Sequence, residues 1–369
     1  MQAIASTPNE LLLVGVPGPT LDAATAARLR RLQPGGFILF GRNIVSAPQL
    51  RQLTDDLRDL SATEPVITID QEGGRVSRLR LIGHEPPNAQ QLRERGDPRL
   101  IAEHGRLTGE LLRLFGFNLD LCPVLDISFD DEADNSLRGR CYGSSVAETI
   151  ANAETFRAAM AAAGILSCGK HFPGYTFAGL DPHHELPRID RSRAELEACE
   201  LAVFRAFAAT VDSMMIGHAH YPCFEPAAAV PASLSAAVIR DCLVRELGFR
   251  GLVMTDDLDM GAILNTFGWD DTIRRAVHAG NHLIMICHRL EAAEDALKVL
   301  EAMPATDLDP ALAAVSAFKR RLAPPTAFTE TAHRTLDEAV WQLRVATLGE
   351  DLARRRSPED GKRSPVEVY

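Results

Sequence analysis

The sequence predicts a single-domain α/β protein built as a (β/α)8 barrel of the TIM type. Eight short apolar runs alternate with amphipathic stretches of helical period along most of the chain. Alternating strands and helices are typical of a parallel sheet covered by helices. Periodicity alone also permits a doubly wound open sheet. However, no G-x-G-x-x-G follows the first strand, which counts against a dinucleotide-binding half.

The eight expected strands are the apolar runs of strand length, at residues 11–17, 36–40, 65–70, 118–127, 165–172, 213–220, 251–257 and 282–288. Helical patterns lie between them, for example at 21–32, 48–60, 99–115 and 236–247. Four helices are expected to end at a glycine in the left-handed conformation, namely Gly116, Gly164, Gly248 and Gly280. We expect residues 1–348 to form the barrel with its C-terminal helices, and residues 349–369 to form a charged, flexible tail.

Composition limits the classes of partner. The chain has 369 residues and a formal net charge of −11, which argues against binding to nucleic acid or to an anionic membrane surface. No stretch approaches the roughly 18 apolar residues of a membrane span, and the N-terminus lacks a basic signal region. The seven cysteines include no C-x-x-C pair and indicate free thiols. We therefore expect a soluble cytoplasmic protein.

Polar and titratable residues follow five successive strands of the predicted barrel. They are Asp70, Asp126, Lys170 with His171, His218 with His220, and Asp256 with Asp257. One charged residue at a strand end is commonly a helix cap or a solvated group. Five strands in succession are better explained by a shared site, because the carboxyl ends of parallel strands meet at one rim. Carboxylates that accept, beside Lys and His that donate, suit a ligand rich in hydroxyl groups.

Two of these segments raise questions of orientation. Asp256 and Asp257 are adjacent on a strand and point to opposite faces, so only one is expected to enter the barrel mouth. Gly73 and Gly74 permit a tight turn that either returns Arg75 toward the mouth or leaves it exposed.

The loop after the fifth strand, at residues 169–187, is rich in titratable groups. Asp181 and His183 are two residues apart, so a carboxylate can hold one imidazole nitrogen while the other faces a substrate. The neighbouring His183-His184 and the pair His218 and His220 are potential metal ligands. No H-E-x-x-H motif or cysteine partner accompanies them, so we expect neither a metal nor an organic cofactor.

Together these segments resemble family 3 glycoside hydrolases, and most closely the small single-domain β-N-acetylglucosaminidases that trim bacterial cell-wall fragments. The resemblance rests on GGFILFGRNI (35–44), ITIDQEGGRVSRL (67–79), PVLDI (123–127), RGRCYG (138–143), KHFPG (170–174), DPHHELP (181–187), MMIGHAHYP (214–222) and the segment 231–262 with its TDDLDM sequence.

The resemblance implies a retaining exo-hydrolase that acts through a glycosyl-enzyme intermediate on a small carbohydrate, and we expect a monomer. Asp256 matches the nucleophile, His183 the acid/base and Asp181 its dyad partner. Residues that match binders of sugar hydroxyls are Asp70, Arg140, Lys170 and His171, and His218 and Met260 match residues that line the pocket.

The chain departs from the family pattern at three places. Tyr175-Thr176 replaces a His-Gly pair, Pro182 replaces a serine within the dyad, and Cys287-His288 stands where an Asn-containing strand end is usual. A β-glucosidase or an N-acetylglucosamine phosphorylase of the same family remains open. From other classes, a Schiff-base lyase using Lys170 and a non-catalytic sugar-binding barrel also remain open. The D-x-H loop favours the N-acetylglucosaminidase branch.

Overall fold

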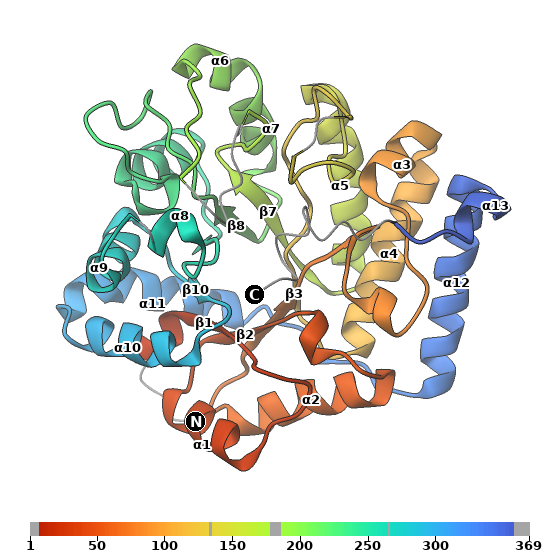
Figure 1. Cartoon of the computed structure of the whole chain (residues 1–369), viewed down its shortest axis with the longest axis horizontal. Helices are drawn as coiled ribbons and strands as arrows, with labels where there is room; N and C mark the ends of the chain where they lie inside the picture. Colours follow the sequence, from red (N-terminus) through yellow and green to blue (C-terminus); the bar gives the residue numbers. More distant parts are fainter. Residues whose placement is uncertain (1–6, 133–134, 178–185, 265, 358–369) are drawn as a thin grey trace.

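The computed structural model describes residues 7–132, 135–177, 186–264 and 266–357. Within them, eight parallel strands form one sheet in the order β10-β1-β2-β3-β6-β7-β8-β9. Helices surround these strands (Figure 1). The predicted (β/α)8 barrel is therefore confirmed. The strands are β1 (Leu12–Gly15), β2 (Gly36–Leu39), β3 (Val66–Ile69), β6 (Leu119–Asp120), β7 (Leu166–Phe172), β8 (Ser213–Ile216), β9 (Leu252–Thr255) and β10 (Ile284–Ile286).

Each barrel strand lies within one of the apolar runs identified in the sequence. Its side chains are buried on both faces, because one face fills the barrel and the other packs against helices. The strand in the run 118–127 is shorter than expected. Only Leu119 and Asp120 pair as β6, and Pro123, which has no N–H to donate, follows soon after. An antiparallel hairpin that the sequence did not predict, β4 (Gln71–Gly73) and β5 (Val76–Ser77), follows β3.

Helices connect successive strands. The α-helices are α1 (Ala23–Leu32), α2 (Ala47–Leu60), α3 (Ala89–Arg95), α4 (Pro98–Leu114), α5 (Val146–Ala162), α6 (Arg193–Ala198), α7 (Glu200–Phe207), α8 (Gly261–Leu264), α9 (Trp269–Ala279), α10 (Leu290–Glu301), α11 (Ala305–Lys319), α12 (Glu330–Leu348) and α13 (Glu350–Ala353). Shorter 3-10 segments are η1 (Pro8–Leu11), η2 (Gly41–Asn43), η3 (Leu79–Leu81) and η4 (Ala232–Leu234), and η5 (Ala237–Glu246) is π-helical.

The four glycines predicted to end helices all have positive φ, between 77° and 112°. Left-handed backbone at these positions is confirmed, and it turns the chain from each helix into the following strand.

Side-chain atoms help to close the barrel between β9 and β10. Leu283 donates its N–H to the Val253 carbonyl and accepts from the Thr255 N–H, each at 3.1 Å. The Val253 N–H is bound instead by the imidazole of His282, at 3.1 Å from Nδ1. The closure of the ring therefore depends partly on an imidazole that must keep this nitrogen unprotonated.

The long helix α12, near the C-terminus, lies beside α4 and also contacts α3 and α2 (Figure 1). Arg344 on α12 donates to Glu85 Oε1 at 3.0 Å and to the Ala353 carbonyl at 2.9 Å. The Ser357 hydroxyl also donates to Glu85, at 2.7 Å. The first residues of the predicted tail are thus bound to the barrel. Residues 358–369 lie outside the described residues, so the domain boundary at 349 stays a prediction. No helix in the described part of the chain is long and apolar enough to cross a bilayer.

We predict that His282→Ala destabilises the protein by about 1–3 kcal/mol, because the buried Val253 N–H loses its acceptor. His282→Asn, which offers a side-chain oxygen close to the position of Nδ1, should recover most of this loss. Urea denaturation of the three proteins at pH 7.5 measures the difference. Equal stability of His282→Ala and wild type would contradict this role of the imidazole.

The buried imidazole of His282 also predicts that the free energy of unfolding falls at acid pH. Burial lowers the pKa of His282 from 6.5 to about 4. The unfolded chain therefore binds a proton near pH 6.5, while the folded chain resists it until about pH 4. The contribution of His282 to the free energy of unfolding is therefore complete above pH 6.5 and declines as the pH falls toward 4. The free energy of unfolding of His282→Asn should decline less steeply over this pH window.

Candidate active site

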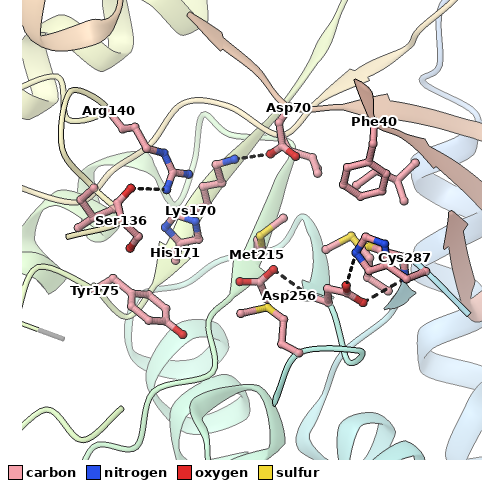
Figure 2. A pocket seen from close by; sticks show the side chains of 17 residues that line it. Phe40, Asp70, Ser136, Arg140, Lys170, His171, Tyr175, Met215, Asp256 and Cys287 are labelled. Carbon is pink, nitrogen blue, oxygen red and sulfur yellow. Dashed lines mark hydrogen bonds and ion pairs between the residues drawn. The ribbon is translucent and has the colours of Figure 1, made fainter. Parts of the chain in front are cut away.

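A cavity opens at the carboxyl ends of the strands. Six of the residues expected to form the site line it, namely Asp70, Arg140, Lys170, His171, Asp256 and Met260. Figure 2 shows Lys170, Arg140 and His171 along one wall and Asp256 with Cys287 along another. The barrel thus brings together residues from β3, β7, β9 and the loop before α5.

The first wall is built around ion pairs. Lys170 Nζ lies 2.6 Å from Asp70 Oδ1 and 2.6 Å from Glu72 Oε1. Burial by itself would lower the pKa of Lys170, but Asp70 and Glu72 outweigh it and raise the pKa above its ordinary value. Lys170 is therefore held as an ammonium ion. A Schiff-base mechanism needs a neutral amine, so this geometry argues against the lyase alternative.

Glu72 is a residue of this wall that the site assignment from sequence missed. Its carboxylate accepts two hydrogen bonds from Arg140, from Nε at 2.7 Å and from Nη2 at 2.8 Å. Burial would raise the pKa of Glu72, but Arg140 and Lys170 together hold it well below its usual range. Glu72 lies on β4, two residues beyond Asp70 at the end of β3. It fixes Arg140 and Lys170 from behind and does not itself line the cavity.

His171 is oriented by a carboxylate. Its Nδ1 lies 2.8 Å from Asp126 Oδ2, and the backbone N–H groups of His171 and Tyr175 also donate to Asp126, at 3.2 and 2.6 Å. Asp126 is completely buried. Because Nδ1 is bound to Asp126, Nε2 is the nitrogen with which His171 can contact a ligand in the cavity.

The opposite wall separates the roles of the two adjacent aspartates. Asp257 Oδ1 accepts the N–H groups of Cys287 and Asp259, each at 3.0 Å, and its Oδ2 lies 3.3 Å from His288 Nε2. Asp256 is half-buried and faces the cavity, with Oδ1 accepting the Asp257 N–H at 2.8 Å (Figure 2). Both carboxylates touch the cavity. Asp257 is engaged in holding the end of β10, and Asp256 has a carboxylate that faces the cavity.

His218 does not line the cavity, contrary to the expectation from sequence. It is completely buried behind the wall, with Nδ1 2.8 Å from Ser233 Oγ and Nε2 2.9 Å from the Asp257 carbonyl oxygen. Its ring supports the turn that carries Asp256, so the residue positions the site without reaching a ligand in the cavity.

The turn at Gly73 and Gly74 is confirmed by φ angles of 109° and 54°. However, Arg75 does not return to the mouth. Its guanidinium donates to the carbonyl oxygens of Ser136 and Arg138, at 2.7 and 3.3 Å, and so braces the loop that carries Arg140.

His220 is also structural. Its backbone N–H donates to the Pro187 carbonyl at 2.8 Å, and its Nδ1 lies 3.2 Å from the Val230 carbonyl. Within the residues that the structure describes, no three His, Cys, Asp or Glu side chains are grouped as metal ligands. Asp181 and His183 lie outside the described residues, and their place in the site stays a prediction.

The chain matches the family model described as glycosyl hydrolase family 3 N terminal domain over residues 6–317. It belongs to glycosyl hydrolase family 3. Because the family match and the cavity agree, this family 3 protein is a glycoside hydrolase, as the sequence predicts.

Relatives and solved structures support this assignment. A β-hexosaminidase of Vibrio cholerae serotype O1 is 35% identical over 295 residues, which cover 79% of this chain and 87% of that protein. The structure of a family 3 β-N-acetylglucosaminidase from Paenibacillus matches with a TM-score of 0.84 and 30% identity, covering 94% of this chain and 69% of that one. Native NagZ from Neisseria gonorrhoeae matches with a TM-score of 0.79 and 26% identity over 94% of this chain and all of that one.

We predict that Glu72→Gln lowers the free energy of unfolding by about 3–5 kcal/mol, because it leaves two buried cations short of one negative charge. The variant should also raise KM, since Lys170 and Arg140 lose their fixed positions. Denaturant unfolding and steady-state kinetics measure the two effects.

Glu103→Gln is the matched control. Glu103 pairs with Arg106 at 2.6 Å, with both side chains about 40% exposed, and its loss should change stability by less than about 1 kcal/mol. Similar small effects of both substitutions would show that the buried cluster does not stabilise the mouth of the barrel.

Proposed function

We propose that this enzyme is a retaining exo-β-N-acetylglucosaminidase that removes terminal β-linked N-acetylglucosamine from small carbohydrates. The observation that carries the proposal is the cavity itself. It presents the Asp256 carboxylate across from a wall of fixed hydrogen-bonding groups, in a chain whose curated relatives include β-hexosaminidases. This is the arrangement that glycoside cleavage needs on one side of the sugar.

The first wall provides the binding of a pyranose. Lys170, Arg140 and His171 offer donors, and Asp70 offers an acceptor, so vicinal hydroxyl groups can be matched in fixed directions. These groups are held by Glu72 and Asp126 before a substrate arrives. Because little reorganisation is needed on binding, the sugar is oriented with its anomeric carbon toward Asp256.

In the proposed mechanism, Asp256 attacks the anomeric carbon and the bond to the leaving oxygen breaks, giving a glycosyl-enzyme intermediate. The hydrogen bond from the Asp257 N–H to Asp256 Oδ1 orients the carboxylate for this attack. Water then attacks the intermediate from the side that the leaving group occupied, and net retention results.

His183 is proposed as the acid/base and Asp181 as the carboxylate that orients it. An imidazole with an ordinary pKa near 6.5 can give a proton to the leaving oxygen and then take one from water near neutral pH. For retention, this group and the nucleophile must approach to about 5–5.5 Å on either side of the glycosidic bond. The proposal rests on the D-x-H spacing and the family resemblance.

We further propose that the natural substrates are fragments of bacterial cell wall and that the enzyme works in the cytoplasm. The family branch that the sequence resembles supports the first point. The free thiols of all seven cysteines are compatible with a reducing compartment and support the second.

The experiment that tests the function compares aryl β-glycosides that differ only at the 2-position. The N-acetylglucosaminide should be cleaved far faster than the glucoside, at a rate independent of phosphate, with the β-anomer as the first product by NMR. Asp256→Asn should lower turnover by about 10³-fold or more without unfolding the protein, whereas Asp270→Asn, an exposed change on α9, should have no effect. Preference for the glucoside, or acceleration by phosphate, would favour the other activities of the family.

The acid role of His183 predicts a dependence on the leaving group. His183→Ala should slow substrates with poor leaving groups, such as alkyl glycosides, much more than activated dinitrophenyl glycosides, which leave without protonation. The slope of log kcat/KM against leaving-group pKa measures this. An unchanged slope would assign the acid to another residue.

A further inference from the structure

Two exposed aromatic rings lie on loops that also contribute residues to the cavity lining, Arg140 from one loop and Tyr175 from the other. Phe129 and Phe177 are 47% and 40% exposed, and their rings stack with centroids 5.3 Å apart and planes 27° apart. Single exposed apolar side chains are common on protein surfaces. A stacked pair from two different loops is less common, and beside a ligand cavity it indicates a contact surface.

The chain holds this pair in place with hydrogen bonds. Thr176 donates its hydroxyl to the Ile127 carbonyl at 2.7 Å and accepts the Ile127 N–H at 3.2 Å. Phe177 follows Thr176 directly, and Phe129 is two residues beyond Ile127. The two loops are therefore joined immediately before the rings, and the pair, which we name the rim platform, is formed before any ligand binds.

The rim platform is continuous with the cavity. Tyr175, two residues before Phe177, lines the cavity and meets the ring of His171 edge-on at 5.4 Å. Its own ring fills the space beside Gly217, where an added Cβ would lie 2.0 Å from Tyr175 Cε2. The wall that binds the sugar in the cavity thus extends through Tyr175 to the platform.

The chemistry of the platform suits a sugar ring. The C–H-rich face of a pyranose packs on aromatic faces, and the rings bring large apolar area with little loss of side-chain freedom. The Arg191 guanidinium lies over the Phe177 ring, 4.2 Å from its centroid, so this face of Phe177 is covered. Phe129, which is 47% exposed, therefore offers the ring on which a sugar can pack.

We propose that the rim platform of Phe129 and Phe177 binds the sugar on the leaving-group side of the scissile bond. This inference rests on the proposed exo-hydrolase function. In that reaction the cavity holds the terminal sugar, so the rest of the substrate extends through the mouth where the platform lies. Thr176, at a position where the family usually has glycine, provides the hydroxyl that fixes the two loops.

The test separates substrates with and without a leaving sugar. Phe129→Ala and Phe177→Ala should lower kcat/KM for N,N′-diacetylchitobiose about tenfold. Both should leave kcat/KM for β-N-acetylglucosaminyl fluoride unchanged, because fluoride occupies no leaving-sugar site. Thr176→Val, which keeps the side-chain shape but removes both hydrogen bonds, should show a smaller loss with the same selectivity.

Leu352→Ala on α13 removes another exposed apolar side chain, 52% exposed, and should change neither substrate. Equal losses on chitobiose and on the fluoride, or no loss on chitobiose, would overturn the platform. If the wild-type enzyme cleaves neither compound, the proposed function itself fails. If it cleaves both and the variants match it on both, only the platform fails.

Discussion

The mouth of this barrel depends on one buried carboxylate, Glu72, that is shared between two cations. Its two oxygens receive Arg140 in a bidentate pair and Lys170 in a single contact, so three distant segments of chain meet at one point. Buried charges are unfavourable unless their partners satisfy them fully. Here the hydrogen bonds to both oxygens meet that condition, and bidentate geometry fixes the direction of the guanidinium as well as its distance.

The balance of charge around Glu72 follows from a further buried acid. Burial raises the pKa of Asp120 well above its ordinary value, so its charged form is disfavoured there. Asp70 and Glu72 are the carboxylates that contact Lys170, and the buried Arg78 guanidinium also lies 3.9 Å from Asp70. Because two carboxylates contact it, Lys170 can be buried as an ammonium ion, which donates hydrogen bonds and is not a nucleophile.

The opposite wall has to accommodate three carboxylates, because Asp256, Asp257 and Asp259 lie within four residues. Asp259 accepts the N–H groups of His288 and Arg289 and pairs with the Arg289 side chain at 2.7 Å. Arg42 donates to the Cys287 carbonyl at 2.6 Å, and its Nη1 lies 3.1 Å from His288 Nδ1. Because arginine only donates, Nδ1 of His288 must accept, which places the proton on Nε2, facing Asp257. His288, in the Cys287-His288 pair that stands where an Asn-containing strand end is usual, therefore links Arg42 to Asp257.

The sequence predicts the barrel well because its strands are buried on both faces and read as continuous apolar runs, each preceded by a helix. It predicts less well the direction in which a side chain points. His218 follows β8 as a lining residue should, yet its ring turns behind the wall to meet Ser233. Arg75 follows the predicted turn, but its guanidinium binds the carbonyl groups of Ser136 and Arg138 and does not itself line the cavity. Glu72 was missed because its role depends on contacts with residues about 70 and 100 positions away along the chain.

The departures at Tyr175 and Thr176 show how a motif can change without loss of the site around it. The Tyr175 backbone N–H donates to Asp126, which also orients His171, so the first wall of the cavity keeps its support. The side chains of the two residues act elsewhere, Tyr175 beside Gly217 and Thr176 on Ile127. Under the proposed function, the backbone contact supports the groups that bind the terminal sugar, while the side chains lead toward the proposed rim platform. The two proposed tasks therefore depend on different atoms of the same residues.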